Sequence, residues 1–243
     1  MTLRLRIVLF TISILLPAIA AGAWMVAATY SRERSASNAT VRETVRALSL
    51  VVERELQRRD AIVRTLAASD SLQKWDLPAF DRQARAATKG LVEGFVAVLD
   101  ESQQYVNTSI DGPMPVMLRP TPFTLAQDEP ALTDPFVGRT SGNLQLAYNV
   151  PVRVGGKLYN VSMPIMPTEL QRVITEQNVP EGWIAAIVSK SGHIIARAPN
   201  PDRWVGQSAT TDFLSRVKGE PEGFFDAVSL DGQPILNFYS TSE

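Results

Sequence analysis

The N-terminal part of the chain is a long apolar run. Residues 7–30 contain no charged side chain. A helix of this length rises roughly 36 Å, which exceeds the roughly 30 Å of a bilayer hydrocarbon core. Arg4 and Arg6 precede the run, and positively charged residues favour the cytoplasmic side of a membrane. We therefore predict a transmembrane helix over 7–30 and a cytoplasmic N-terminus over 1–6.

A cleaved secretory signal is the main alternative for this run. The triplets Ala18-Ile19-Ala20 and Ala21-Gly22-Ala23 have the small-x-small form of cleavage sites. The apolar core of a signal is about 7–15 residues long, however, and this run is longer. A buried helix of a soluble protein is a third reading. Both the anchor and the signal place the remainder of the chain outside the cytoplasm.

Residues 31–69 contain neither Pro nor Gly and show helical periodicity. Apolar side chains recur mostly three or four positions apart, as on one helix face, at Val41, Val45, Leu48, Val52, Leu56, Ile62 and Leu66. The opposite positions carry charged residues, Arg59 among them. The pattern predicts a long amphipathic stalk helix, continuous with the membrane helix. We expect its apolar stripe to pack on its own domain and in part on a second copy, which gives a homodimer.

The period changes to that of strands after a short helical segment. Residues 70–88 predict a turn and a helix starting at Leu77-Pro78. The expected strands cover 95–99, 105–108, 143–153 and 158–166, the last two joined by a turn at Gly155-Gly156. The Pro-rich segment 111–134 separates the two hairpins, and loops of this length often contact ligands. Residues 167–176 predict a helix.

The same order of hairpins then recurs. Strands over 182–187 and 193–197 echo the first hairpin, and strands over 223–229 and 234–239 echo the hairpin that turns at Gly155-Gly156. Two matches in one order indicate an internal repeat. The predicted fold class is therefore α+β: a membrane helix continuing into a long amphipathic helix, then two antiparallel β-sheet units in tandem. Its parts are 1–6, the membrane helix 7–30, the stalk 31–69, a first unit 70–166, a linker helix 167–181 and a second unit 182–243 that stops early.

Composition excludes several classes of function. The 24 Lys and Arg balance 25 Asp and Glu, so there is no basic excess for binding nucleic acid. There is no Cys, and His193 is the single His. A zinc site therefore cannot be assembled, and a Ser–His couple would have to use His193, which excludes most such chemistry. Gly-rich phosphate-binding motifs are also absent from the sequence. We expect no cofactor, no metal and no catalytic residue in this chain.

Polar residues on the strands of the first unit are candidates for a ligand pocket. A pocket that is mostly apolar with a few convergent polar groups is the usual form of such sites. The candidates are Asn107, Arg139, Tyr148, Asn160 and Ser162. Arg139 would suit an anionic ligand, because a guanidinium binds a carboxylate through two parallel hydrogen bonds. The alternative is that Arg139, Asn160 and Ser162 face solvent.

Several segments carry a resemblance to a known family. They are FVAVLD (95–100), VPVRVGG (150–156), GHIIAR (192–197), WVG (204–206) and SLDG (229–232). In this order, and after an anchor and a long helix, they resemble the double Cache (tandem PAS-like) extracytoplasmic sensor domain of bacterial transmembrane receptors. The pair of helices expected over 55–87 is most similar to Cache modules of sensor histidine kinases.

The resemblance implies a function in signalling. The first, membrane-distal unit would hold a small ligand, and the second would relay the signal. A second membrane helix would lead to a cytoplasmic output, commonly a histidine kinase of a two-component system, sometimes a diguanylate cyclase or a chemotaxis module. We therefore expect the sensing region of a membrane-bound histidine kinase, anchored by one helix in the inner membrane with its bulk in the periplasm.

Two further expectations follow from the same comparison. The chain stops before a second membrane helix, so we expect a fragment or a truncated product. The Tyr…Arg-x-Trp-Tyr pattern of the amino-acid-sensing branch is absent, which argues against amino acids as ligands. Independently of the family, the residues also permit a periplasmic protein-interaction module that binds no small ligand.

Overall fold

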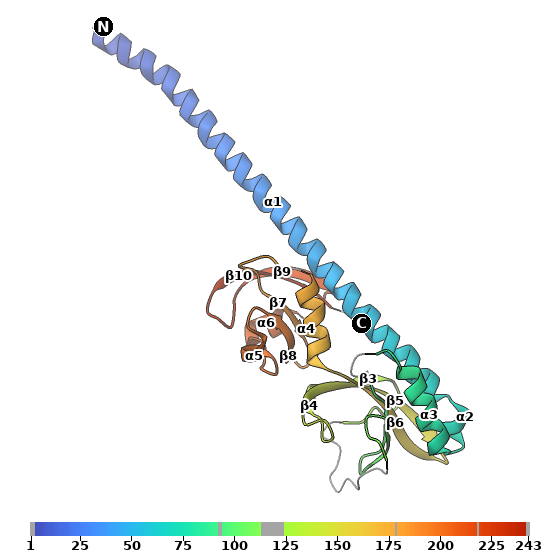
Figure 1. The fold of residues 1–243 in the computed structure, drawn as a ribbon. Coiled ribbons are helices and arrows are strands. Elements are labelled where there is room, and N and C mark those ends of the chain that lie inside the picture. The colour runs from blue at the N-terminus through green and yellow to red at the C-terminus, as the bar shows by residue number, and fades with distance from the viewer. Residues whose placement is uncertain (1–2, 92–93, 113–123, 178, 218, 242–243) are drawn as a thin grey trace.

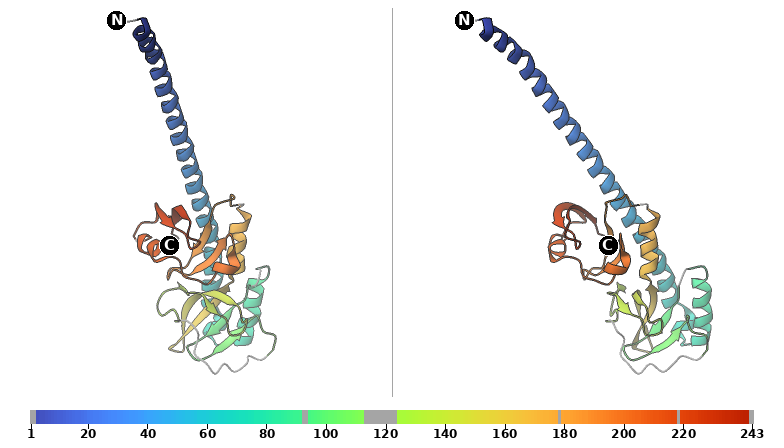
Figure 2. Two further views of the ribbon diagram at one scale, coloured as in Figure 1. Left: turned by 90° about the vertical axis from the view of Figure 1, so that its left-hand side faces the viewer. Right: turned by 60° about the vertical axis from the view of Figure 1, so that its left-hand side comes forward.

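One long helix organises the molecule. A computed structural model describes residues 3–91, 94–112, 124–177, 179–217 and 219–241, and most side chains before Asn38 lie outside the described set. Helix α1 (Leu3–Ala67) is continuous, as the periodicity predicts. Its N-terminal half stands clear of the rest of the chain, which packs along the C-terminal half (Figure 1; Figure 2).

The expected membrane segment 7–30 is the N-terminal half of this helix. Its backbone is helical, and most of its side chains are among those not described. Within the described residues, no helix combines the length and the apolarity needed to cross a membrane. The membrane assignment of 7–30 therefore stays a prediction.

Two short helices close the end of α1. Helix α2 (Asp70–Gln73) is capped by the Ser69 hydroxyl, which accepts from the Leu72 amide at 3.4 Å. Helix α3 (Leu77–Thr88) begins after Asp76, whose carboxylate accepts from the Ala79 amide at 3.0 Å. Both caps satisfy first-turn amides that have no partner inside the helix. The expected helix start at Leu77-Pro78 is confirmed.

The first sheet is antiparallel, with strand order β2-β1-β6-β5-β3 and with β4 also paired to β5. Its strands are β1 (Ala97–Leu99), β2 (Gln104–Asn107), β3 (Ala131–Leu132), β4 (Phe136–Val137), β5 (Leu144–Val154) and β6 (Lys157–Ile165). Gly155 and Gly156 join β5 to β6, and both have positive φ, as tight hairpin turns require. This two-residue turn sets the register of the central β5–β6 pair.

One face of the first sheet packs on α1. Tyr159, Val161 and Met163 alternate along β6 and share a core with Val63 and Leu66 of α1. Packing against this face buries the C-terminal end of the apolar stripe of α1. The first sheet is thereby held on the stalk, and its other face points away from α1.

Helix α4 (Pro167–Glu176) leads into the C-terminal region, residues 182–241. Leu170 and Ile174 of α4 pack between Leu146 of the first sheet and Ile195 of the C-terminal region. An ion pair adds to this junction: Arg59 of α1 is fully buried and contacts Glu169 of α4. Arg59 is one of the charged residues opposite the apolar stripe of α1, and it is buried because Glu169 of α4 packs against it.

The C-terminal region contains two hairpins and two short helices. Its elements are β7 (Ala185–Val188), β8 (Ile194–Ala198), α5 (Pro201–Trp204), α6 (Thr211–Arg216), β9 (Glu222–Val228) and β10 (Pro234–Ser240). Among the described residues, β7–β8 and β9–β10 form separate two-stranded sheets. The hairpins lie where the sequence predicts them, and α5 and α6 were not predicted. The equivalence of two tandem units stays a prediction.

Candidate ligand site on the first sheet

A row of buried polar side chains crosses the face of the first sheet that points away from α1. Asn107 pairs with Ala97, Ala97 pairs with Ser162, and Ser162 pairs with Asn149 in the antiparallel register. Residues directly opposite each other in an antiparallel pair point to the same face. Asn107, Asn149 and Ser162 therefore share this face, and all three are buried. Together with Asn160, they are called the amide face below.

Asn149 is a member of the amide face whose side chain is unpaired within the described part of the chain. It is 1% exposed, and neither its Nδ2 nor its Oδ1 has a hydrogen-bond partner among the residues described. Leaving a buried polar group unpaired costs about 1–3 kcal/mol, and such groups are rare in native structures. The side-chain amide offers two donors and one acceptor, so it is suited to a ligand that supplies both.

Asn160 lies on the same face, two residues before Ser162 on β6, and both of its side-chain polar atoms have a partner. Its Oδ1 accepts from the Ala126 amide and its Nδ2 donates to the Ala126 carbonyl, both at 3.0 Å. Leu125, next to Ala126, packs on Ala97 and Leu99 of β1. Asn160 thus fixes the chain at 125–126 over this face of the sheet.

Asn107 occupies the β2 end of the row. Its Nδ2 donates to Gln104 Oε1 at 3.1 Å and to Thr140 Oγ1 at 3.4 Å, and its Oδ1 accepts from the Ser109 hydroxyl at 2.6 Å. The contact with Thr140 brings the segment before β5 to the edge of the amide face. Arg139 precedes Thr140 in that segment, and its side chain is exposed.

Tyr148 points the other way. It pairs with Met163, whose side chain faces α1, and its hydroxyl donates to Asp60 of α1. Arg64 binds the same Asp60 oxygen at 2.6 Å. Burial and the neighbouring Asp60 carboxylate raise the pKa of the Tyr148 hydroxyl. Tyr148 therefore joins the first sheet to the stalk, on the face opposite to Asn160 and Ser162.

The structure brings together three of the five residues that the sequence suggested: Asn107, Asn160 and Ser162. The alternative that Asn160 and Ser162 face solvent is wrong, since they are 0% and 4% exposed. A role of any of the five in ligand binding stays a prediction. Asn149 was missed, although the turn at Gly155-Gly156 places it opposite Ser162 and could have indicated it.

A charged pair stabilises the nearby end of the first sheet. Asp100 follows β1, is buried, and binds Lys157 Nζ at 2.6 Å and the Tyr105 hydroxyl at 2.8 Å. Burial raises the pKa of the Asp100 carboxyl, but hydrogen bonds from Lys157, Ser102 and Tyr105 outweigh it and hold the pKa well below its usual range. The same contacts raise the pKa of Lys157. Asp100 has its partners within the protein and is not a free ligand group.

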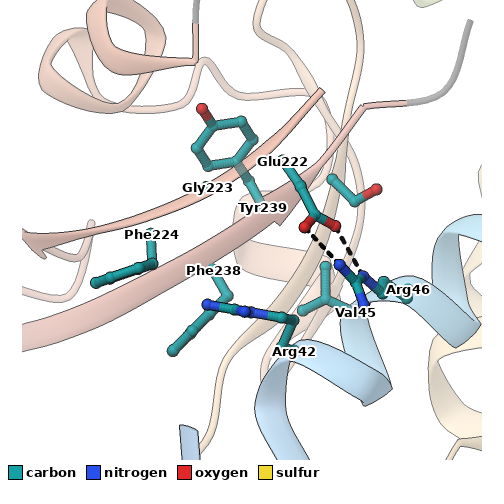
Figure 3. Close-up of a pocket in the computed structure, with 9 residues that line it drawn as sticks. Arg42, Val45, Arg46, Glu222, Gly223, Phe224, Phe238 and Tyr239 are labelled. Carbon is teal, nitrogen blue, oxygen red and sulfur yellow. Dashed lines mark hydrogen bonds and ion pairs between the residues drawn. The ribbon is translucent and has the colours of Figure 1, made fainter. Parts of the chain in front are cut away.

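A hollow lies between α1 and the β9–β10 hairpin and has a volume of about 160 Å³. Arg42, Phe224 and Phe238 form part of its wall (Figure 3). Arg46 binds both carboxylate oxygens of Glu222 across it, at 2.8 and 2.5 Å. This ion pair lowers the pKa of Glu222 and raises that of Arg46. The ion pair between Arg46 and Glu222 therefore links the stalk helix to the β9–β10 hairpin across this hollow.

The groups on the amide face are neutral hydrogen-bonding groups. Across the described ranges, no cluster of His, Asp and Glu is arranged to hold a metal ion. Amides and a hydroxyl recognise a ligand by complementary donors and acceptors. The amide face therefore presents hydrogen-bond donors and acceptors without net charge.

The fold of this chain is similar to those of several solved proteins. No family model and no curated protein matches the sequence. Among solved structures, the chain is similar to the extracellular domain of a protein assigned as a histidine kinase, rpHK1S-Z16, with a TM-score of 0.65 and 20% identity over 80% of this chain and 85% of that one.

Chemoreceptors give similar matches. The ligand-binding domain of Pseudomonas fluorescens CtaA, in complex with L-serine, has a TM-score of 0.61 and 14% identity, covering 84% of this chain and 89% of that one. The ligand-binding domain of Pseudomonas aeruginosa PctC, with GABA, has a TM-score of 0.53 and 19% identity, covering 80% and 88%. The fold is that of extracellular sensor domains of bacterial receptors, which confirms the expected likeness to a Cache sensor domain.

Proposed function

We propose that this chain is the extracytoplasmic sensing region of a membrane-bound receptor, and that it binds a small polar ligand on the amide face. The observation that carries this proposal is the buried side-chain amide of Asn149, which lacks a partner among the described residues. Ser162 directly opposite and Asn107 in the same row add further polar groups. A bound ligand would satisfy groups that otherwise destabilise the folded chain.

The output module that fits best is a histidine kinase. The similarity to the rpHK1S-Z16 extracellular domain supports this choice, because its TM-score of 0.65 exceeds those of CtaA and PctC. A chemoreceptor is the second candidate, supported by the CtaA and PctC matches. In either receptor, residues 7–30 would anchor the chain in the inner membrane, and α1 would pair with α1 of a second copy.

The ligand class follows from the chemistry of the amide face. Amides offer donors and acceptors without net charge, which suits a neutral or zwitterionic molecule. The ligands in the CtaA and PctC structures, L-serine and GABA, are zwitterions. A purely anionic ligand held by Arg139 is less favoured, because the Arg139 side chain is exposed. We therefore propose a small zwitterion of amino-acid size, bound through the amide face and not through the Tyr…Arg-x-Trp-Tyr pattern, which the sequence lacks.

A thermal-shift screen of the 243-residue chain in detergent tests this proposal. The panel contains amino acids, GABA, small carboxylates, amines and purines. A ligand present at 100 times its dissociation constant adds about 2.7 kcal/mol to the free energy of unfolding. Asn149→Ala should abolish the stabilisation, whereas Asn143→Ala, at an exposed asparagine just before β5, should preserve it. If no compound stabilises the chain, or if both variants respond alike, the proposed site is wrong.

A further inference from the structure

The C-terminal region contains a second group of buried donors for which the described residues supply no partner. Arg197 on β8 is 3% exposed, and Trp204 on α5 is 6% exposed. Neither Arg197 Nη1 nor Trp204 Nε1 has a hydrogen-bond partner in the part of the chain that the structure describes. Helix α5 lies beside β8 (Figure 1), so both donors belong to one cluster.

Stacking holds the two side chains together. The guanidinium carbon of Arg197 lies 4.6 Å from the centre of the Trp204 ring, and that of Arg203 lies 4.5 Å from the same ring. Arg197 also donates through Nη2 to Asp231, in the turn between β9 and β10. The indole is therefore in cation–π contact with two guanidinium groups. In the Arg197 guanidinium, Nη2 is hydrogen-bonded to Asp231, whereas Nη1 has no partner among the described residues.

The backbone around both residues is fixed by hydrogen bonds. The Arg197 amide donates to the Gln171 side chain of α4 at 2.9 Å. Beyond α5, the Gly206 amide donates to the Ile194 carbonyl, and the Ile194 amide donates to the Gln207 carbonyl, both at 2.8 Å. The open donors are thus attached to segments that cannot turn away without breaking these bonds.

Charge and hydrogen-bonding capacity together define the missing partner. A guanidinium N–H and an indole N–H are both donors and cannot accept, so the partner must supply acceptors. Two arginines contact Trp204, and Asp231 offsets one of their charges. We propose that this cluster is an anion site, in which Arg197 Nη1 and Trp204 Nε1 donate to a small carboxylate. The site is separate from the amide face of the first sheet.

Indole NMR on the 243-residue chain in detergent tests this directly. The chain has four tryptophans, and labelling them with ¹⁵N gives one indole resonance each. Trp204→Phe, which keeps an aromatic ring for stacking, identifies the Trp204 resonance by its loss. We expect titration with sodium acetate to shift the Trp204 resonance until it saturates, and sodium chloride at equal ionic strength to leave it in place. The resonances of Trp75 and Trp183 should stay unchanged and report that the fold is intact.

A pair of arginine variants completes the test. Arg197→Lys removes the Nη1 donor, and we expect acetate to bind about tenfold or more weakly, as for one lost hydrogen bond to a charged group. Arg172→Lys, on the exposed side of α4, and Asn149→Leu in the first sheet should leave acetate binding unchanged. If the Trp204 resonance responds to neither acetate nor formate, or if Arg197→Lys binds acetate as the unmodified chain does, water satisfies these donors and the anion site is refuted.

Discussion

Arg59 of α1 is ion-paired with Glu169 in the first turn of α4, and both side chains are buried. Glu55 of α1 contacts the same guanidinium, and Glu169 also accepts from the Met166 amide at 3.2 Å. The pair thus joins the stalk to the helix that separates the first sheet from the C-terminal region. A movement of α4 relative to α1 would have to break it, which makes it a natural point of coupling between the two regions.

Breaking this pair should destabilise the chain strongly. Glu169→Ala leaves the Arg59 charge buried without its α4 partner, which costs about 3–5 kcal/mol in comparable cases. Urea unfolding followed by circular dichroism measures the change. Glu176→Ala, at an exposed ion pair on the same helix, is the control and should cost about 1 kcal/mol or less. Equal effects of both variants would show that the buried pair is not important for stability.

Replacing Asn149 with Leu should make the ligand-free chain more stable. The substitution removes a buried amide that has no partner within the described ranges and keeps a side chain of similar size, so we expect a gain of about 1 kcal/mol. It should also remove any ligand-induced stabilisation. Chemical denaturation with and without the best compound of the screen measures both effects. A loss of stability in the ligand-free chain would mean that the Asn149 amide is already satisfied.

Tyr148→Phe separates a structural role of Tyr148 from a ligand-binding role. The variant loses the hydrogen bond to Asp60, which costs about 1.5–3 kcal/mol for a bond to a charged group. Because Tyr148 faces α1, ligand affinity should stay the same. Isothermal titration with the identified ligand checks the affinity, and urea unfolding checks the stability. A large loss of ligand affinity without a loss of stability would show that Tyr148 contacts the ligand.

The Asp100–Lys157 pair predicts a defined dependence of stability on pH. The pKa of Asp100 is lowered in the folded chain, so its contribution is complete above the ordinary carboxyl pKa of about 4 and is lost as pH falls toward the folded value. The pKa of Lys157 is raised, so its contribution is complete below about pH 10.5 and is lost at higher pH. Between these limits the stabilisation by the pair should be constant.

Asp100→Asn tests this window. The variant should be less stable at neutral pH and should lose less of its stability than the unmodified chain when the pH falls below about 4. Urea midpoints measured from neutral to acidic pH give the comparison. Asp128→Asn, at an exposed position, provides the control. If the urea midpoints of the Asp100→Asn and unmodified chains fall equally as the pH is lowered below about 4, the proposed contribution of Asp100 to stability is wrong.

Much of the local structure could be read from the sequence, because it depends on neighbouring residues. Periodicity of three to four predicted α1 and α4, and α4 has the expected bounds of Pro167–Glu176. Period-two alternation and the turn at Gly155-Gly156 predicted the central hairpin. Helices α5 and α6 were missed because they are only 4 and 6 residues long, too short for a helical period to show.

The candidate site could be predicted only in part. Alternation along β5 and β6 indicated which residues share a face, but not which face packs on α1. That choice depends on Val63 and Leu66, which are distant in sequence and cover the Tyr159, Val161 and Met163 face. Packing of that face on α1 turned Tyr148 toward the stalk, and it left Asn149 buried on the other side without a partner among the described residues.

The sequence by itself determined the kind of protein: one long helix, antiparallel hairpins in a recognisable order, and a composition with no Cys and a single His. Tertiary structure decided which polar groups are buried and which of them are paired. Arg59 depends on Glu169, Asn160 on Ala126 and Arg197 on Asp231. Burial and pairing arise between segments far apart in the chain, so the local patterns that predict helices and strands carry no information about them.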